Sequence, residues 1–140
     1  MPYARLLYHV VWATKHRRPS ITEAREAIIR ASIAATSQEM NLAVYGVGKM
    51  PDHVHVFTQI SPTLAVARVI GRSNGASSHA VNAMSPDASE CFAWQEGYGA
   101  LSVSQSGFDR VLAYVQHQRE RHAARGLYGV MERMDDPGAG

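Results

Sequence analysis

The segment of residues 53–60, HVHVFTQI, constrains the fold of this 140-residue chain more than any other. Polar and apolar residues alternate at its start, and the side chains of a β-strand point alternately to the two faces of a sheet. We therefore predict a strand in which His53 and His55 share one face while Val54 and Val56 share the other. The valines would pack against helices, and the histidines would lie on the face that the helices leave open.

The residue patterns around this segment predict further strands and helices. Alternation and runs of aromatic and β-branched residues predict strands over residues 3–14, 41–49 and 98–105. Apolar residues at helical spacing predict helices over residues 20–40, 62–81 and 108–122.

The order of these elements favours one fold class. Ser20 opens a capping-box pattern, and Ser61-Pro62 is typical of an N-cap followed by proline at the first helical position. With these starts the order is strand, helix, strand, strand, helix, strand, helix. This order predicts an α+β protein with a ferredoxin-like or RRM-like split β-α-β plan. Its four-stranded antiparallel sheet would carry helices on one face and a further helix at the C-terminus.

Length and cysteine content bound the organisation of the chain. The length is that of one domain, which we expect over residues 1–133, with a surface loop at 85–97 and a disordered tail at 134–140. Cys91 is the single cysteine, so no intramolecular disulfide can form, which favours a reducing, cytoplasmic compartment. No apolar run approaches the roughly 20 residues of a membrane span, so no membrane partner is expected.

Four side chains could together bind a metal ion and act on a phosphate. Tyr114 and Gln118 are four residues apart on the predicted last helix, so they share one helix face beside its apolar stripe. With His53 and His55, the amide oxygen of Gln118 would give three ligands of mixed nitrogen and oxygen type. Such a set suits Mg²⁺ or Mn²⁺, and Zn²⁺ also accepts it. Taken singly, each pair also fits incidental surface histidines, or a half-buried tyrosine beside a solvated glutamine.

Tyr114 is the candidate nucleophile of this set. A phenol has an ordinary pKa of about 10, so it attacks poorly at neutral pH unless a metal or basic groups favour the phenolate. A metal would also act as a Lewis acid on the scissile phosphate. The product would be a phosphotyrosine ester, which conserves the energy of the cut bond and allows resealing without ATP.

Basic side chains cluster where a nucleic acid could bind. The net charge of +2 and the sequence pI of about 8.9 permit such binding without requiring it. Lys15, Arg17 and Arg18 follow the first strand, and Arg68 and Arg72 lie one turn apart on the second helix. These five residues are candidate phosphate contacts, although charge alone also fits solvated segments.

The motifs carry a resemblance to a known family. Pro51-Asp52-His53-Val54-His55 matches the HUH motif, in which U is a bulky apolar residue. The chain resembles the single-tyrosine HUH transposases of the smallest bacterial insertion sequences and their relatives, the REP-associated tyrosine transposases. Four further segments are similar to family motifs and follow in family order: YHVVWATKHRRP at 8–19, GASS at 75–78, WQEGYGA at 94–100 and YVQHQ at 114–118.

This resemblance implies a function and its partners. The chain would cleave and rejoin single-stranded DNA at hairpin-bearing element ends, through a 5′-phosphotyrosine at Tyr114. Mg²⁺ or Mn²⁺ held by His53, His55 and Gln118, a homodimer, and no small-molecule substrate are also implied. The family often has lysine just before the GASS segment; here Asn74 is the candidate DNA contact and carries no charge.

Two alternatives accompany this interpretation. A domesticated or non-catalytic protein of the same fold could bind hairpins of single-stranded DNA or RNA without cutting, although such binders stack bases on aromatic residues rather than on histidines. The position of the last helix is also open. Gly97, Gly99 and Gly107 precede it, so it could dock on its own sheet or on a partner's, and the resemblance implies that it can serve the partner's histidines.

Overall fold

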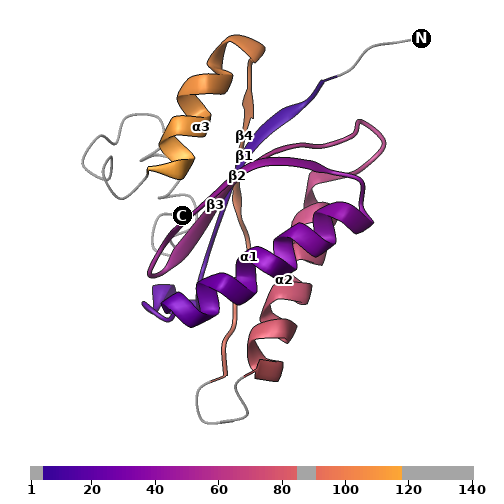
Figure 1. Ribbon diagram of the computed structural model, residues 1–140. Helices are drawn as coiled ribbons and strands as arrows, with labels where there is room; N and C mark the ends of the chain where they lie inside the picture. Colours follow the sequence, from indigo (N-terminus) through magenta and orange to yellow (C-terminus); the bar gives the residue numbers. More distant parts are fainter. Residues whose placement is uncertain (1–4, 85–90, 118–140) are drawn as a thin grey trace.

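The computed structural model describes residues 5–84 and 91–117 (Figure 1). Its strands are β1 (Leu7–Ala13), β2 (Ala43–Met50), β3 (His53–Gln59) and β4 (Gly99–Val103). Its α-helices are α1 (Glu23–Glu39), α2 (Val66–Met84) and α3 (Phe108–Gln116), with short 3₁₀ turns η1 (Lys15–Arg17) and η3 (Gln105–Gly107). The predicted order of strands and helices is confirmed. None of the helices in the described part of the chain has the length and apolar character that crossing a membrane requires.

The four strands form one antiparallel sheet in the order β2-β3-β1-β4. This is the strand order of the ferredoxin-like plan, so the predicted α+β fold class is confirmed. The two central strands, β1 and β3, pair with Val10 opposite Val56 and Val11 opposite His55. The HUH strand is therefore in the middle of the sheet.

The main core lies between one face of the sheet and the helices α1 and α2. Val54 and Val56 point into it, as predicted from the alternation of β3, and lie 1% and 4% exposed. The helices contribute Ile29 and Ile33 from α1 and Ile70 and Val81 from α2. Figure 1 shows α1 and α2 side by side on this side of the sheet.

The opposite face of the sheet is not open, and this part of the prediction is wrong. Helix α3 lies on it, on the other side of the sheet from α1 and α2 (Figure 1). Val111 and Val115 of α3 pack with Leu7 and Phe57 in a second core. Gly46 of β2 allows this close approach, because a Cβ there would lie 3.1 Å from Leu112 Cδ1.

Both helices of the main core begin later than predicted. Thr22, rather than Ser20, caps α1: its hydroxyl accepts a hydrogen bond from the Arg25 N–H at 3.2 Å. Helix α2 begins only at Val66, because residues 61–64 form a separate turn in which the Leu64 N–H donates to the Ser61 carbonyl at 3.0 Å.

Two residues of the predicted surface loop, Phe92 and Trp94, pack in the main core. Phe92 is only 3% exposed, and both its backbone N–H and its carbonyl bond the side-chain amide of Asn82, at 2.8 and 2.9 Å. The Trp94 ring packs edge-on against Trp12, and an isolated antiparallel β-bridge pairs Trp94 with Thr14. The described part of the segment is irregular as predicted, but the predicted surface position is wrong for Phe92 and Trp94, while residues 85–90 lie outside the described part of the chain.

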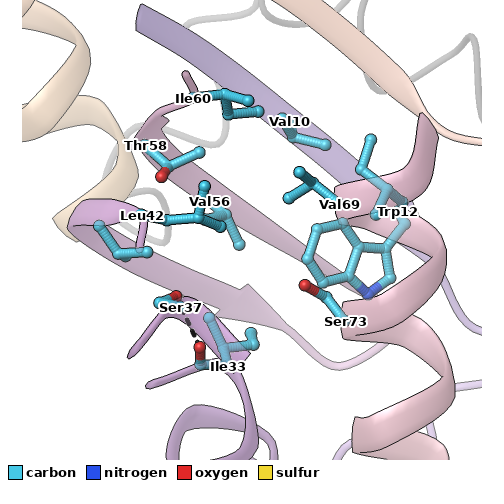
Figure 2. A pocket seen from close by; sticks show the side chains of 12 residues that line it. Val10, Trp12, Ile33, Ser37, Leu42, Val56, Thr58, Ile60, Val69 and Ser73 are labelled. Atoms are coloured by element: carbon cyan, nitrogen blue, oxygen red, sulfur yellow. Dashed lines mark hydrogen bonds between the residues drawn. The ribbon is translucent and has the colours of Figure 1, made fainter. Parts of the chain in front are cut away.

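A cavity between the sheet and the two core helices is too small for a ligand. Its volume is about 20 Å³, and Val10, Trp12, Ile33, Val56 and Ser73 are among the side chains that line it (Figure 2). That volume holds no more than one water molecule. This cavity is therefore part of the packing between the sheet and the two helices.

Candidate active site

The two histidines of the HUH motif lie together on the α3 side of β3. They are two residues apart on a strand, so their rings point to the same face, with centroids 5.0 Å apart. His53 is 2% exposed and His55 is fully buried. The predicted common face is confirmed, but the rings are enclosed rather than displayed.

A carboxylate orients the first histidine. His53 Nδ1 lies 2.7 Å from Asp52 Oδ1, and Asp52 Oδ2 lies 3.3 Å from Arg17 Nε. The hydrogen bond from His53, and then the charges of His53 and Arg17, hold the pKa of Asp52 below its ordinary value although the carboxylate is partly buried. Because Nδ1 donates to this carboxylate, Nε2 is the ring nitrogen that would bind a metal ion.

Tyr114 is brought against the second histidine. Its ring lies on α3 with the centroid 5.6 Å from that of His55, at an interplanar angle of 74°. It is 6% exposed and packs in the second core with Leu7, Phe57 and Val115. The expectation that Tyr114 flanks the apolar stripe is therefore wrong: the ring lies within it, because Leu7 and Phe57 extend the apolar surface beside the histidines.

The donor set fits a divalent metal ion as far as the structure describes it. Two buried imidazoles, one of them bonded to a carboxylate, are the usual nitrogen ligands of such ions. The predicted third ligand, Gln118, lies outside the described residues, as does the predicted extension of α3 to residue 122. Within residues 5–84 and 91–117, no group of three or more His, Cys, Asp or Glu side chains could hold a metal.

The basic loop after β1 is attached directly to the HUH motif. The Thr14 N–H donates to the Asp52 carbonyl at 2.8 Å, and the Thr14 hydroxyl donates to the Arg18 carbonyl at 2.6 Å. His16 and Arg17 have φ angles of 59° and 51°, a region that non-glycine residues rarely adopt. These contacts hold the loop in a strained conformation beside the histidines.

Lys15 and Arg18 line an open cleft of about 400 Å³ next to this loop. Arg25, from the first turn of α1, adds a third cation, and none of the described lining residues is acidic. A cleft lined by positively charged side chains attracts phosphate groups. The cleft also contains the exposed thiol of Cys91.

The structure separates the other predicted DNA contacts from the histidines. Arg68 and Arg72 are exposed on α2, the helix layer on the other side of the sheet from His53 and His55. Arg72 forms an ion pair with Glu39 of α1. Asn74 is half-buried on the same helix.

Residue-by-residue interpretation of the sequence missed three side chains. His9 occupies β1 and contacts both His55 and Tyr114, although it was noted only as a letter of a motif. Asp52 appears in the sequence only as part of the HUH match, and Arg25 lies in the predicted helix 20–40 without a role. The alternation of Tyr8, His9 and Val10 is the signal that could have found His9, since it puts a histidine on the same face as those of β3.

Comparison with known proteins decides the family. A family described as "Transposase IS200 like" matches residues 3–118, from before β1 to the end of the YVQHQ segment. The chain belongs to the IS200-like transposase family. The resemblance inferred from the five motifs is confirmed.

Individual relatives of this IS200-like transposase agree with that assignment. The ISDra2 transposase TnpA of Deinococcus radiodurans is 23% identical over 121 residues, which are 84% of this chain and 86% of that protein. A crystal structure of a candidate transposase from D. radiodurans R1 has a TM-score of 0.69 at 21% identity and covers 81% of this chain and 91% of its own. A REP-associated tyrosine transposase, solved bound to a REP hairpin, has a TM-score of 0.67 at 11% identity over 87% of this chain and 72% of that one. The structural matches show a shared fold.

Proposed function

We propose that this IS200-like transposase cleaves and rejoins single-stranded DNA with Tyr114 as the nucleophile. The observation that carries the proposal is the contact between Tyr114 and His55, whose ring centroids are 5.6 Å apart on the face that also holds His53. A phenol beside two potential metal ligands is the arrangement that phosphoryl transfer through tyrosine requires.

The reaction consists of successive phosphoryl transfers, in each of which one phosphoester bond breaks and another forms. The Tyr114 oxygen, having lost its proton, attacks the scissile phosphorus; the bond from phosphorus to the 3′ oxygen breaks, and that oxygen leaves as a 3′ hydroxyl after taking up a proton. The DNA is then joined to Tyr114 through its 5′ phosphate. Attack by a 3′ hydroxyl on this ester reverses the transfer and releases the tyrosine. A divalent ion, Mg²⁺ or Mn²⁺, held by His53, His55 and Gln118, would neutralise charge on the phosphate.

The basic cleft is the proposed path of the DNA backbone towards the histidines. Lys15, Arg18 and Arg25 line it. Arg17, from the same loop, forms an ion pair with Asp52. One structural relative was solved bound to a REP hairpin, which supports a folded single strand as the partner. We extend this proposal to Arg68, Arg72 and Asn74 as a separate contact on α2, because they lie on the other side of the sheet.

A cleavage assay tests this function. Labelled single-stranded DNA from the flanks of the gene is incubated with the full-length protein in Mn²⁺ and, separately, in EDTA. We expect cleavage and a protein–DNA adduct with Mn²⁺ and neither in EDTA. Binding without cleavage under every metal condition would favour the alternative of a domesticated hairpin-binding protein, and full cleavage in EDTA would contradict the metal site.

A further inference from the structure

A third buried histidine lies beside the HUH pair. Its place follows from strand register: in the antiparallel pairing of β1 with β3, Val11 is opposite His55 and His9 is opposite Phe57. His9 is therefore a diagonal neighbour of His55 on the same face of the sheet, within reach of a long side chain. His9 is fully buried.

The contact between His9 and His55 is a hydrogen bond between ring nitrogens. His9 Nε2 lies 2.7 Å from His55 Nδ1, and the two rings are stacked with centroids 4.9 Å apart and an interplanar angle of 30°. One nitrogen of this pair must carry the hydrogen and the other must accept it. The direction of this one bond therefore determines the tautomer of His55.

Only one direction is compatible with metal binding by His55. If His9 Nε2 carries the hydrogen, His55 Nδ1 accepts it, and the proton of a neutral His55 is on Nε2, which then cannot bind a metal ion. If His55 Nδ1 carries the hydrogen and His9 Nε2 accepts it, the lone pair of His55 Nε2 is directed towards the ion. Asp52 has the same relation to His53, through an acceptor 2.7 Å from Nδ1.

We propose that His9 is a positioning residue that fixes His55 as its Nδ1–H tautomer and holds its ring for metal binding through Nε2. This inference rests on the proposed metal-dependent function. Each HUH histidine thus has its own acceptor: a carboxylate for His53 and an imidazole for His55. When Nε2 accepts the hydrogen bond, the proton of a neutral His9 is on Nδ1, so His9 offers no lone pair to the ion and supports a ligand rather than being the third one.

The tautomer is measured directly in the metal-free protein. Ring ¹⁵N–¹H correlation spectra of the ¹⁵N-histidine-labelled chain are recorded above the ordinary imidazole pKa of about 6.5, with His55 assigned by comparison with His55→Gln. We expect the pattern of an Nδ1–H tautomer for His55 in the wild type. An Nε2–H pattern for His55 would overturn the proposal whatever the DNA assay shows.

Variants of His9 separate positioning from packing. His9→Leu removes the acceptor, and we expect Mn²⁺ affinity measured by calorimetry to fall about 10- to 100-fold. His9→Gln keeps an acceptor oxygen near the position of Nε2 and should restore most of that affinity. Val10→Ala, on the other face of the same strand, is the matched control: it leaves a cavity in the main core but should not change Mn²⁺ affinity.

The outcomes distinguish this inference from the proposed function. Equal Mn²⁺ affinity in the wild type and His9→Leu would overturn it, and so would His9→Gln binding as weakly as His9→Leu while unfolding at the same urea concentration as the wild type. If His9→Leu does not fold, the tautomer of the wild type and the affinity of His9→Gln still decide. A protein with the expected tautomer and Mn²⁺ affinity that never cuts DNA would refute the proposed function and leave the positioning role intact.

Discussion

Asp52 contacts two residues with different proposed roles, the candidate metal ligand His53 and the cation Arg17. It lies 2.7 Å from His53 Nδ1 and 3.3 Å from Arg17 Nε, and its carbonyl accepts the Thr14 N–H. A single side chain thus couples the orientation of a proposed metal ligand to the position of the basic loop. Replacing it should affect stability and binding together.

We predict that Asp52→Asn destabilises the fold in a pH-dependent way. The pKa of Asp52 lies below its ordinary value of 3.8, so its ionised form stabilises the folded state above that pH and this contribution is lost as the pH falls through the lowered pKa. Near neutral pH the free energy of unfolding of the variant should be lower than that of the wild type by roughly 1 kcal/mol, a modest loss because the group is partly exposed. In strong acid the two proteins should have the same free energy of unfolding. Urea unfolding at pH 7 and at pH 3 measures this difference. A loss of equal size at both pH values would contradict the role of the charge.

The cations of the cleft provide a second prediction at this scale. Lys15→Gln together with Arg18→Gln should weaken the binding of a single strand and reduce the slope of log affinity against log salt by about 0.7 per lost contact. Both side chains are exposed, so the fold should be unaffected. Arg30→Gln, an exposed cation elsewhere on α1, is the control. An unchanged slope would make the cleft an ordinary solvated surface, and the same assay on Arg68→Gln with Arg72→Gln tests α2.

At the scale of the elements, α3 decides whether the histidines are enclosed. Its apolar residues seal the face that holds His53 and His55, and Gly46 of β2 gives it room. A side chain at residue 46 would push against Leu112, so a larger residue there requires the Leu112 side chain to shift.

We expect Gly46→Val to loosen the docking of α3 and to lower the free energy of unfolding by about 1–3 kcal/mol, as overpacking does. Gly71→Ala is the comparison, because a Cβ at residue 71 of α2 meets nothing within 4 Å. That change should raise stability by about 1 kcal/mol through helix propensity. Urea denaturation measures both variants, and a Gly46→Val protein as stable as the wild type would show that α3 does not pack closely on β2.

The elements also show how far the sequence could be interpreted. The alternation of β3 predicted the two faces of the sheet, and the order of strands and helices predicted the fold, because both depend on local periodicity. The predicted open face was wrong, because we assumed that all helices packed on one face of the sheet, whereas α3 packs on the other. Phe57 carried the missing signal: it follows His53 and His55 on the same face, so that face needed an apolar partner.

The candidate site was predicted unevenly for a related reason. His53, His55 and Tyr114 belong to sequence motifs, so they could be named. The contact of His9 with His55 and the place of Arg25 in the cleft could not be predicted, since they depend on strand register and on distant segments. Phe92 and Trp94 looked like loop residues because the bonds that hold them, to Asn82 and β1, are non-local.

On the scale of the whole molecule, α3 packs on the sheet of its own chain and encloses the face that holds His53 and His55. His53, His55 and Tyr114 are all less than 7% exposed, so we expect that the segments enclosing them must move before DNA reaches the tyrosine. The family resemblance implies a homodimer in which the helix can serve a partner. In the single chain, Tyr114 contacts the histidines and the second core of its own sheet.

If each α3 serves its own sheet in the dimer as it does in the single chain, mixing two inactive variants should restore nothing. In a purified heterodimer of Tyr114→Phe and His55→Ala chains carrying different tags, a helix that serves its own sheet leaves both sites broken. The covalent adduct on a denaturing gel is the measurement, with wild-type dimer as the positive control. An adduct at one site per heterodimer would show that the helix is exchanged between subunits.

The central claim is that Tyr114 itself becomes joined to DNA. The most direct measurement is mass spectrometry of the adduct formed with single-stranded DNA and Mn²⁺ after digestion of the protein. The peptide that contains Tyr114 should carry a nucleotide through its 5′ phosphate, and Tyr114→Phe should bind the same DNA with nearly unchanged affinity and form no adduct. An adduct that persists in Tyr114→Phe, or one that maps to another residue such as Tyr128, would contradict the account.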